Sequence, residues 1–152
     1  FNYEFACWKP ERVISFVVNK GGVYYTALAQ EATRAVPGIF FTGAVDNPYR
    51  SNIVKGVFSI NRRFGAKWMF AEEQGVGHQF TASEGFVLEF FDQIIPLRLA
   101  KNGTLIDLAQ AGYIGKNDLK EIGQSDDNRQ YKGITSWFAN KELAELWLTY
   151  IR

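Results

Sequence analysis

An acidic residue and the only histidine of this chain stand at positions from which they can act as an acid–base pair. Asp46 follows the apolar run IFFTGAV, and His78 follows the apolar run WMFA within a glycine-containing segment, EEQGVGHQF. A carboxylate that accepts a hydrogen bond from one imidazole nitrogen fixes the tautomer of the ring and stabilises the imidazolium. The other nitrogen is then free to act as a general base. The pair therefore predicts proton-transfer chemistry, provided that the fold brings the two side chains together.

The segments that must position the pair alternate between strand-like and helix-like patterns. Three apolar, β-rich runs predict strands that are buried on both faces, at residues 13–18, 39–45 and 67–72. Segments of helical composition or spacing surround these runs, at residues 1–8, 26–36, 51–64 and 83–99. Strands separated by helices imply an α/β fold with a mostly parallel sheet and helices on both of its faces.

Polar residues follow the predicted strands at the edge where such sheets bind ligands, outside the carboxyl ends of the strands. Neighbouring parallel strands lie about 4.8 Å apart. We therefore predict that Asp46 and His78 come within hydrogen-bond reach of each other as catalytic residues. Residues just after the first two strands are candidates for lining a substrate pocket; they are Lys20, Gly21, Tyr24 and Asn47.

Each of these residues also has a simpler interpretation. Asp46 precedes Asn and Pro, which is a good turn sequence, and a single loop histidine is more often structural or merely exposed. The stretch KGGVY is equally compatible with a tight turn that carries a surface tyrosine. Glu72 and Glu73, just before the histidine loop, are interpreted as solvated charges, with a hydrogen bond from a backbone amide to one of them as the alternative. The occurrence of Asp46 and His78 after successive strands is what favours a catalytic pair.

The last part of the chain has a different pattern. We assign residues 1–152 to one domain, with a strand and helix core at 1–99 and an appendage at 100–152. Glycines interrupt the appendage at positions 103, 112, 115, 123 and 133. Asn140 is a candidate N-cap for a final helix that runs to Ile151 and buries an apolar face.

The composition argues against several classes of partner and cofactor. Lys and Arg number 17 against 16 Asp and Glu, without blocks of like charge, so a nucleic-acid partner is not expected. The apolar runs are far shorter than the roughly 18 residues of a membrane helix. Cys7 is the only cysteine, His78 is the only histidine, and the carboxylates are not clustered. Neither an internal disulfide nor a metal site is therefore expected.

Three stretches, in this order, resemble the C-terminal half of an α/β-hydrolase: GIFFTGAVDN, WMFAEEQGVGHQF and VLEFFDQIIPLRL. The resemblance is closest to bacterial esterases and polyester-depolymerase-like serine hydrolases. FACWKPERVISFVVNKGG looks like the piece that follows the nucleophile elbow of these enzymes, and SWFANKELAELWLTYI resembles their closing segment. The resemblance implies a catalytic triad in which Asp46 is the acid and His78 the base. It also implies that the enzyme needs no cofactor and acts on a small-molecule or polymeric ester.

The chain departs from the family's pattern at the nucleophile. The nucleophile elbow has the sequence Gly-x-Ser-x-Gly, and no serine here has glycines at both of these positions. The serines are Ser15, Ser51, Ser59, Ser83, Ser125 and Ser136. The resemblance implies that the nucleophile and the oxyanion hole lie before Phe1, in an N-terminal half that would be this chain's partner. We therefore expect the chain to be a fragment that is inactive by itself.

Other functions stay open on the sequence alone. The same catalytic groups serve peptidases and thioesterases, and a non-catalytic α/β module that binds a partner chain is a further alternative. A sheet that begins at residues 13–18 exposes a strand edge, which we expect the N-terminal half or a second copy in a homo-oligomer to cover. The sequence does not fix the compartment, although the frequent export of such esterases favours a secreted or periplasmic location.

Overall fold

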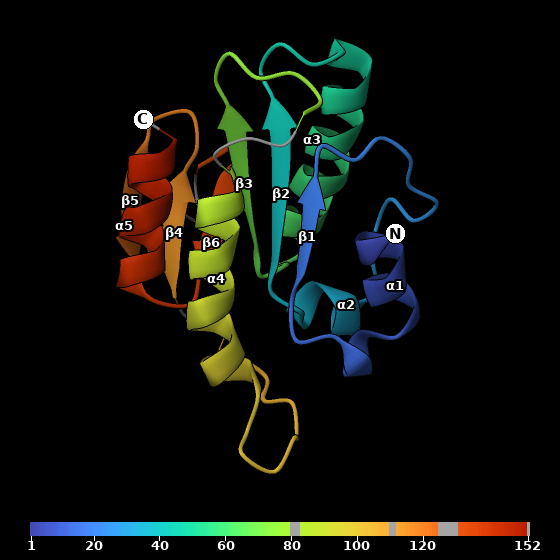
Figure 1. Ribbon diagram of the computed structural model, residues 1–152, viewed down its shortest axis with the longest axis vertical. Coiled ribbons are helices and arrows are strands. Elements are labelled where there is room, and N and C mark those ends of the chain that lie inside the picture. Colours follow the sequence, from blue (N-terminus) through green and yellow to red (C-terminus); the bar gives the residue numbers. More distant parts are fainter. Residues whose placement is uncertain (80–82, 110–111, 125–130, 152) are drawn as a thin grey trace.

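The computed structural model of the chain describes residues 1–79, 83–109, 112–124 and 131–151. These residues form a mixed α/β fold that contains a three-strand parallel sheet, a three-strand antiparallel sheet and five α-helices (Figure 1). The helices are α1 (Asn2–Trp8), α2 (Glu31–Ala35), α3 (Pro48–Arg63), α4 (Ser83–Arg98) and α5 (Lys141–Tyr150), and a short 3-10 helix spans Pro10–Arg12. The strands are β1 (Phe16–Asn19), β2 (Gly38–Gly43), β3 (Trp68–Glu73), β4 (Tyr113–Lys116), β5 (Glu121–Gln124) and β6 (Thr135–Phe138).

The parallel sheet has the strand order β1-β2-β3, as the alternation of strand-like and helix-like segments predicts. Asn19 lies opposite Phe41, and Gly43 lies opposite Glu73. Every residue of β2 is buried, which explains its uninterrupted apolar sequence. Because the three strands run in the same direction, the loops that follow them leave from one edge of the sheet (Figure 1).

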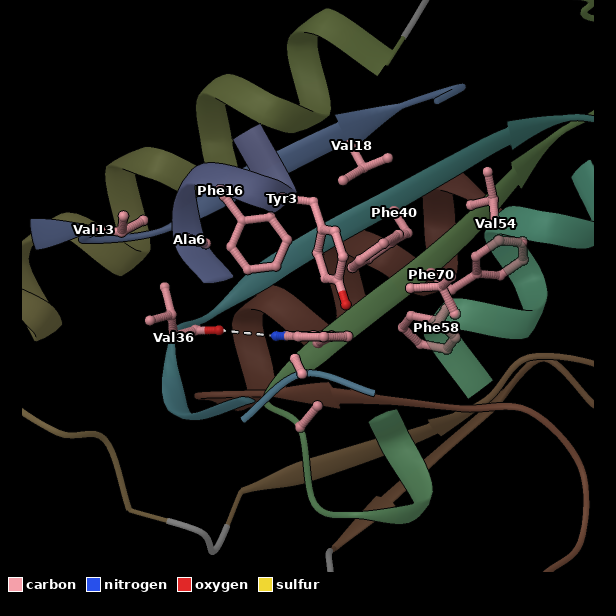
Figure 2. Close-up of a cluster of buried hydrophobic side chains, with 14 residues drawn as sticks. Tyr3, Ala6, Val13, Phe16, Val18, Val36, Phe40, Val54, Phe58 and Phe70 are labelled. Carbon is pink, nitrogen blue, oxygen red and sulfur yellow. Dashed lines mark hydrogen bonds between the residues drawn. The ribbon is translucent and has the colours of Figure 1, made fainter. Parts of the chain in front are cut away.

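Two apolar clusters pack against the two faces of this sheet. On one face, α1 and α3 bury an aromatic group that contains Tyr3, Phe16 and Phe40 (Figure 2). The indole of Trp68 lies in the same group and donates a hydrogen bond to the Val36 carbonyl oxygen at 3.0 Å. On the other face, α4 and α5 pack on a cluster that includes Phe41. The predicted helices on both faces are therefore confirmed.

The helix predicted over residues 26–36 is wrong for its first half. Only Glu31–Ala35 is helical. The preceding residues are held in another conformation by Asn61 of α3, whose Oδ1 accepts from Ala29 N and whose Nδ2 donates to Ala27 O, both at 2.8 Å. These bonds satisfy the backbone from outside, so the segment does not need helical hydrogen bonds of its own.

The strand predicted over residues 13–18 begins later than expected, at Phe16. β2 begins at Gly38, which is the pairing partner of Phe16, so the residues before Phe16 have no strand beside them. The guanidinium of Arg98, at the end of α4, donates instead to the carbonyl oxygens of Ile14 at 3.3 Å and Val13 at 3.5 Å.

The residues after α4 form an antiparallel sheet that the sequence pattern did not predict. Its order is β5-β4-β6, so the expectation of a mostly parallel sheet is wrong for the chain as a whole. Glycines interrupt the apolar pattern of these short strands, so the pattern did not reveal them. Gly115, in the middle of β4, is needed there because a Cβ would lie 2.5 Å from the Trp147 ring. The final helix is confirmed, and Asn140 caps it by accepting from Leu143 N at 2.8 Å.

Side chains of this last part complete the hydrogen bonds of β3 along its outer edge. The Phe70 carbonyl oxygen accepts from Asn117 Nδ2 at 2.7 Å and from Trp147 Nε1 at 2.8 Å. The Phe70 N–H donates to Ser136 Oγ at 2.9 Å. Side chains thus satisfy the outward-facing backbone groups of Phe70, at an edge of β3 with which no further strand pairs in the described residues.

Candidate active site

Asp46 and His78 meet at the carboxyl ends of β2 and β3. The distance from Asp46 Oδ2 to His78 Nδ1 is 3.0 Å, which is a hydrogen bond. The Asp46 side chain is 6% exposed, whereas the imidazole is 55% exposed. A buried carboxylate therefore holds one nitrogen of a ring that is otherwise open to solvent.

The turn after β2 holds the Asp46 carboxylate in place. Oδ1 accepts from Asn47 N at 2.7 Å and from the Arg50 guanidinium at 3.4 Å, which leaves Oδ2 for the histidine. The hydrogen bond from His78, together with the Asn47 N–H and the charge on Arg50, lowers the pKa of Asp46. The carboxylate is therefore ionised at neutral pH and suited to stabilise an imidazolium.

Close packing of two loops brings His78 to Asp46. Val45 N donates to Val76 O at 3.1 Å, and Ala44 N donates to Glu73 O at 2.9 Å. This contact requires a glycine at position 43, because a Cβ there would lie 2.3 Å from Val76 O and 2.2 Å from Gly77 O. The apolar run at residues 39–45 predicted a strand there, but the need for a glycine at position 43 was missed.

The arrangement is suited to general base catalysis. With Nδ1–H donated to Asp46, the lone pair of neutral His78 is on Nε2. The first serine after the histidine, Ser83, is not placed to be its nucleophile, because it is fully buried and its Oγ accepts from Asn19 Nδ2 at 3.2 Å. Ser125 lies outside the described residues.

Two of the four predicted pocket residues line a cleft at the end of β1. The cleft has a volume of about 790 Å³, and Gly21 and Tyr24 line it together with Phe1, Asn2, Val17 and Glu84. A Cβ on Gly21 would lie 2.4 Å from the Tyr24 hydroxyl oxygen, so a glycine at this position leaves room for the Tyr24 side chain. Burial raises the pKa of Tyr24.

The other two predicted pocket residues lie elsewhere. Lys20 has a positive φ of 54° and a side chain only 1% exposed, which forms an ion pair with Glu73 inside the protein. Asn47 is the N-cap of α3, and its Oδ1 accepts from Tyr49 N at 3.0 Å. Neither residue lines the cleft at the end of β1.

The interpretation of Glu73 as a solvated charge is wrong, and the alternative, that one of the two glutamates holds a backbone amide, is confirmed. Its side chain is 4% exposed and its carboxylate accepts from Ser83 N at 3.2 Å and from the Tyr150 hydroxyl at 2.7 Å. The alternation of side chains along the strand indicates the burial of Glu73. Glu73 is on the same face of β3 as Met69 and Ala71, which both lie in the cluster beneath α4 and α5.

Comparisons of the chain with protein-family models, with curated proteins and with solved structures found no match. Across the part of the chain that the structure describes, no helix has the length and apolar character needed to cross a membrane. In the same residues, no three His, Cys, Asp or Glu side chains gather in a way that could hold a metal ion.

The lowered pKa of Asp46 predicts a pH-dependent contribution to stability. A carboxyl whose pKa is lower in the folded than in the unfolded state stabilises the fold above its unfolded pKa, ordinarily 3.8. That contribution is lost as the pH falls through the folded-state pKa, below 3.8. We expect urea unfolding of wild type and Asp46→Asn to differ most near neutral pH, and the difference to shrink at the acid end. A difference that is the same at every pH contradicts this account.

Proposed function

We propose that the protein is a serine hydrolase with an α/β-hydrolase fold that cleaves carboxylic esters by acyl transfer. The observation that carries the proposal is the 3.0 Å hydrogen bond from His78 Nδ1 to the buried carboxylate of Asp46 at the ends of adjacent parallel strands. The order of strands and helices from β1 to α4 agrees with the resemblance to the C-terminal half of such enzymes.

In the proposed reaction His78 moves the proton and Asp46 orients the ring. A serine hydroxyl attacks the ester carbonyl carbon, forming a C–O bond, while His78 Nε2 takes the hydroxyl proton. The tetrahedral intermediate collapses, the ester C–O bond breaks, and the alcohol leaves with that proton. Water then attacks the acyl-enzyme in the same way, which releases the acid and frees the serine. No step needs a cofactor.

The serine and the oxyanion hole are proposed to come from an N-terminal half that precedes Phe1. The outer edge of β1 supports this proposal, because in the described residues no strand pairs with it. The Val17 carbonyl oxygen faces that edge and accepts from the Asn2 side chain at 3.0 Å. A groove of about 540 Å³ follows the edge between α1 and α4, with Phe5, Phe16, Phe91 and Ile95 among its lining residues. An added strand with apolar side chains would fill it.

Fluorophosphonate labelling of the complete gene product tests the proposal. Fluorophosphonates form a covalent adduct with an activated serine, and intact-mass spectrometry followed by peptide mapping locates it. We expect one adduct, on a serine that precedes Phe1, and none in the His78→Ala variant. An adduct on a serine of the present chain refutes the proposed nucleophile. The absence of any adduct refutes the hydrolase.

Labelling separates one of two alternatives from the proposed esterase, and a comparison of substrates separates the other. A peptidase or thioesterase would also form the adduct, and paired ester, thioester and amide substrates with the same acyl group distinguish it. A non-catalytic α/β interaction module would form none. The open edge of β1 and its apolar groove favour that module as the second candidate, with the N-terminal half or a second copy of the chain as the bound partner.

A further inference from the structure

A buried carboxylate joins the two ends of the segment that carries His78. The segment leaves the sheet at Glu73, the last residue of β3, and returns at Ser83, the first residue of α4. Glu73 Oε1 accepts from the backbone N–H of Ser83 at 3.2 Å. One side chain therefore fixes the distance between the start and the end of the histidine segment.

The same carboxylate is bound from two other elements. The hydroxyl of Tyr150, at the end of α5, donates to Glu73 Oε1 at 2.7 Å, and the Lys20 ammonium pairs with Oε2. Lys20 Nζ also donates to Asn19 Oδ1 at 2.9 Å, and Asn19 Nδ2 donates to Ser83 Oγ at 3.2 Å. Glu73, Ser83, Asn19 and Lys20 thus form a closed ring of hydrogen bonds, to which Tyr150 is attached. These five residues, which we call the Glu73 cluster, tie β1, β3, α4 and α5 together.

The stability of the fold alone does not explain why the buried Lys20–Glu73 pair is charged. The Lys20 and Glu73 side chains are 1% and 4% exposed. Removing two charges from water costs much of the free energy that their attraction returns. Proteins with well-packed apolar residues in such positions are often at least as stable. Lys20 in addition has a positive φ of 54°, which a non-glycine residue adopts at a cost. Both costs are consistent with a pair retained for its geometry.

We propose that Glu73 is a positioning residue that keeps His78 within hydrogen-bond reach of Asp46. The inference deepens the proposed function and rests on it. The hydrogen bonds of Ala44 and Val45 to Glu73 O and Val76 O hold the first half of the histidine segment. The Glu73 carboxylate holds its other end, at Ser83. Without that second attachment, the imidazole samples positions away from the carboxylate.

Nitrogen-15 NMR of the histidine ring tests the inference directly. His78 is the only histidine of this chain, and its signals in the complete protein are those that disappear in His78→Ala. The measurement is made at a pH of about 8, where histidines are ordinarily neutral. The Nδ1–H tautomer is expected to dominate in wild type, since Asp46 accepts from Nδ1. The Asp46→Ala variant gives the reference value for complete loss of this contact.

Two double variants separate positioning from stability. Lys20→Met with Glu73→Leu removes both charges and the acceptor for Ser83 N, and we expect the tautomer ratio to fall to that of Asp46→Ala. Lys20→Met with Glu73→Gln also removes both charges but keeps an acceptor oxygen, and we expect it to retain the wild-type ratio. Ser136→Ala is the control at the outer edge of β3. It removes the acceptor of the Phe70 N–H and should lower the stability of the fold without changing the tautomer ratio of His78.

The result that overturns the inference is a wild-type tautomer ratio in the Glu73→Leu double variant, provided urea unfolding shows that it is folded. The same ratio in both double variants, whether high or low, also overturns it, since the acceptor at position 73 would then not matter. Failure of the proposed function looks different. In that case wild type itself shows no preference for the Nδ1–H tautomer, or the complete protein takes no fluorophosphonate.

Discussion

Replacement of Asp46 by Asn is expected, under the proposed hydrolase mechanism, to lower kcat by about 10⁴-fold. The amide no longer requires a hydrogen bond from Nδ1–H and can itself donate to Nδ1. That donation favours the tautomer in which Nε2 is protonated and is unable to accept the serine proton. His78→Ala should cost a similar factor, because it removes the base itself.

Both variants are expected to fold. The imidazole is 55% exposed and makes no contribution to the two apolar clusters. Circular dichroism and urea unfolding check this expectation beside the kinetics. Asp92→Asn on the exposed surface of α4 is the matched charge control and should keep wild-type turnover. Wild-type turnover in His78→Ala would remove both residues from the mechanism.

Replacement of Gly43 by Ala is expected to damage both the fold and the site. The added methyl would meet two backbone carbonyl oxygens, those of Val76 and Gly77, at 2.3 and 2.2 Å. Backbone atoms cannot rotate away as a flexible side chain can, so the histidine segment must move from the end of β2. Overpacking of this kind costs about 1–3 kcal/mol. A shift of about 1 Å in a catalytic group costs roughly 10²-fold in rate.

Gly56→Ala is the matched control for Gly43→Ala. Gly56 lies in α3, and a Cβ there meets nothing within 4 Å. Alanine is the better helix former by about 1 kcal/mol, so this variant should be slightly more stable than wild type. Urea unfolding, kcat and the His78 tautomer ratio are measured for both variants. If Gly43→Ala matches Gly56→Ala in all three, close passage of the two loops is not what brings His78 to Asp46.

Local pattern determined much of the architecture. The apolar runs predicted β1, β2 and β3 to within a few residues, because strands buried on both faces have no polar position. Asn140 was recognised as an N-cap, because capping depends on neighbouring residues only. The juxtaposition of Asp46 and His78 was also predictable, since parallel strands bring the residues that follow them to one edge.

The tertiary structure decided what depends on distant partners. The hydrogen-bond partners of Glu73 include Tyr150, which lies 77 positions away, and the path of residues 27–29 depends on Asn61. The need for a glycine at position 43 appears only when a loop from another strand crosses it. The sequence by itself thus determined the strands of the parallel sheet and which two residues form the acid–base pair. Only packing between elements far apart in the chain decided which side chains hold that pair in place, because such contacts have no local periodicity to reveal them.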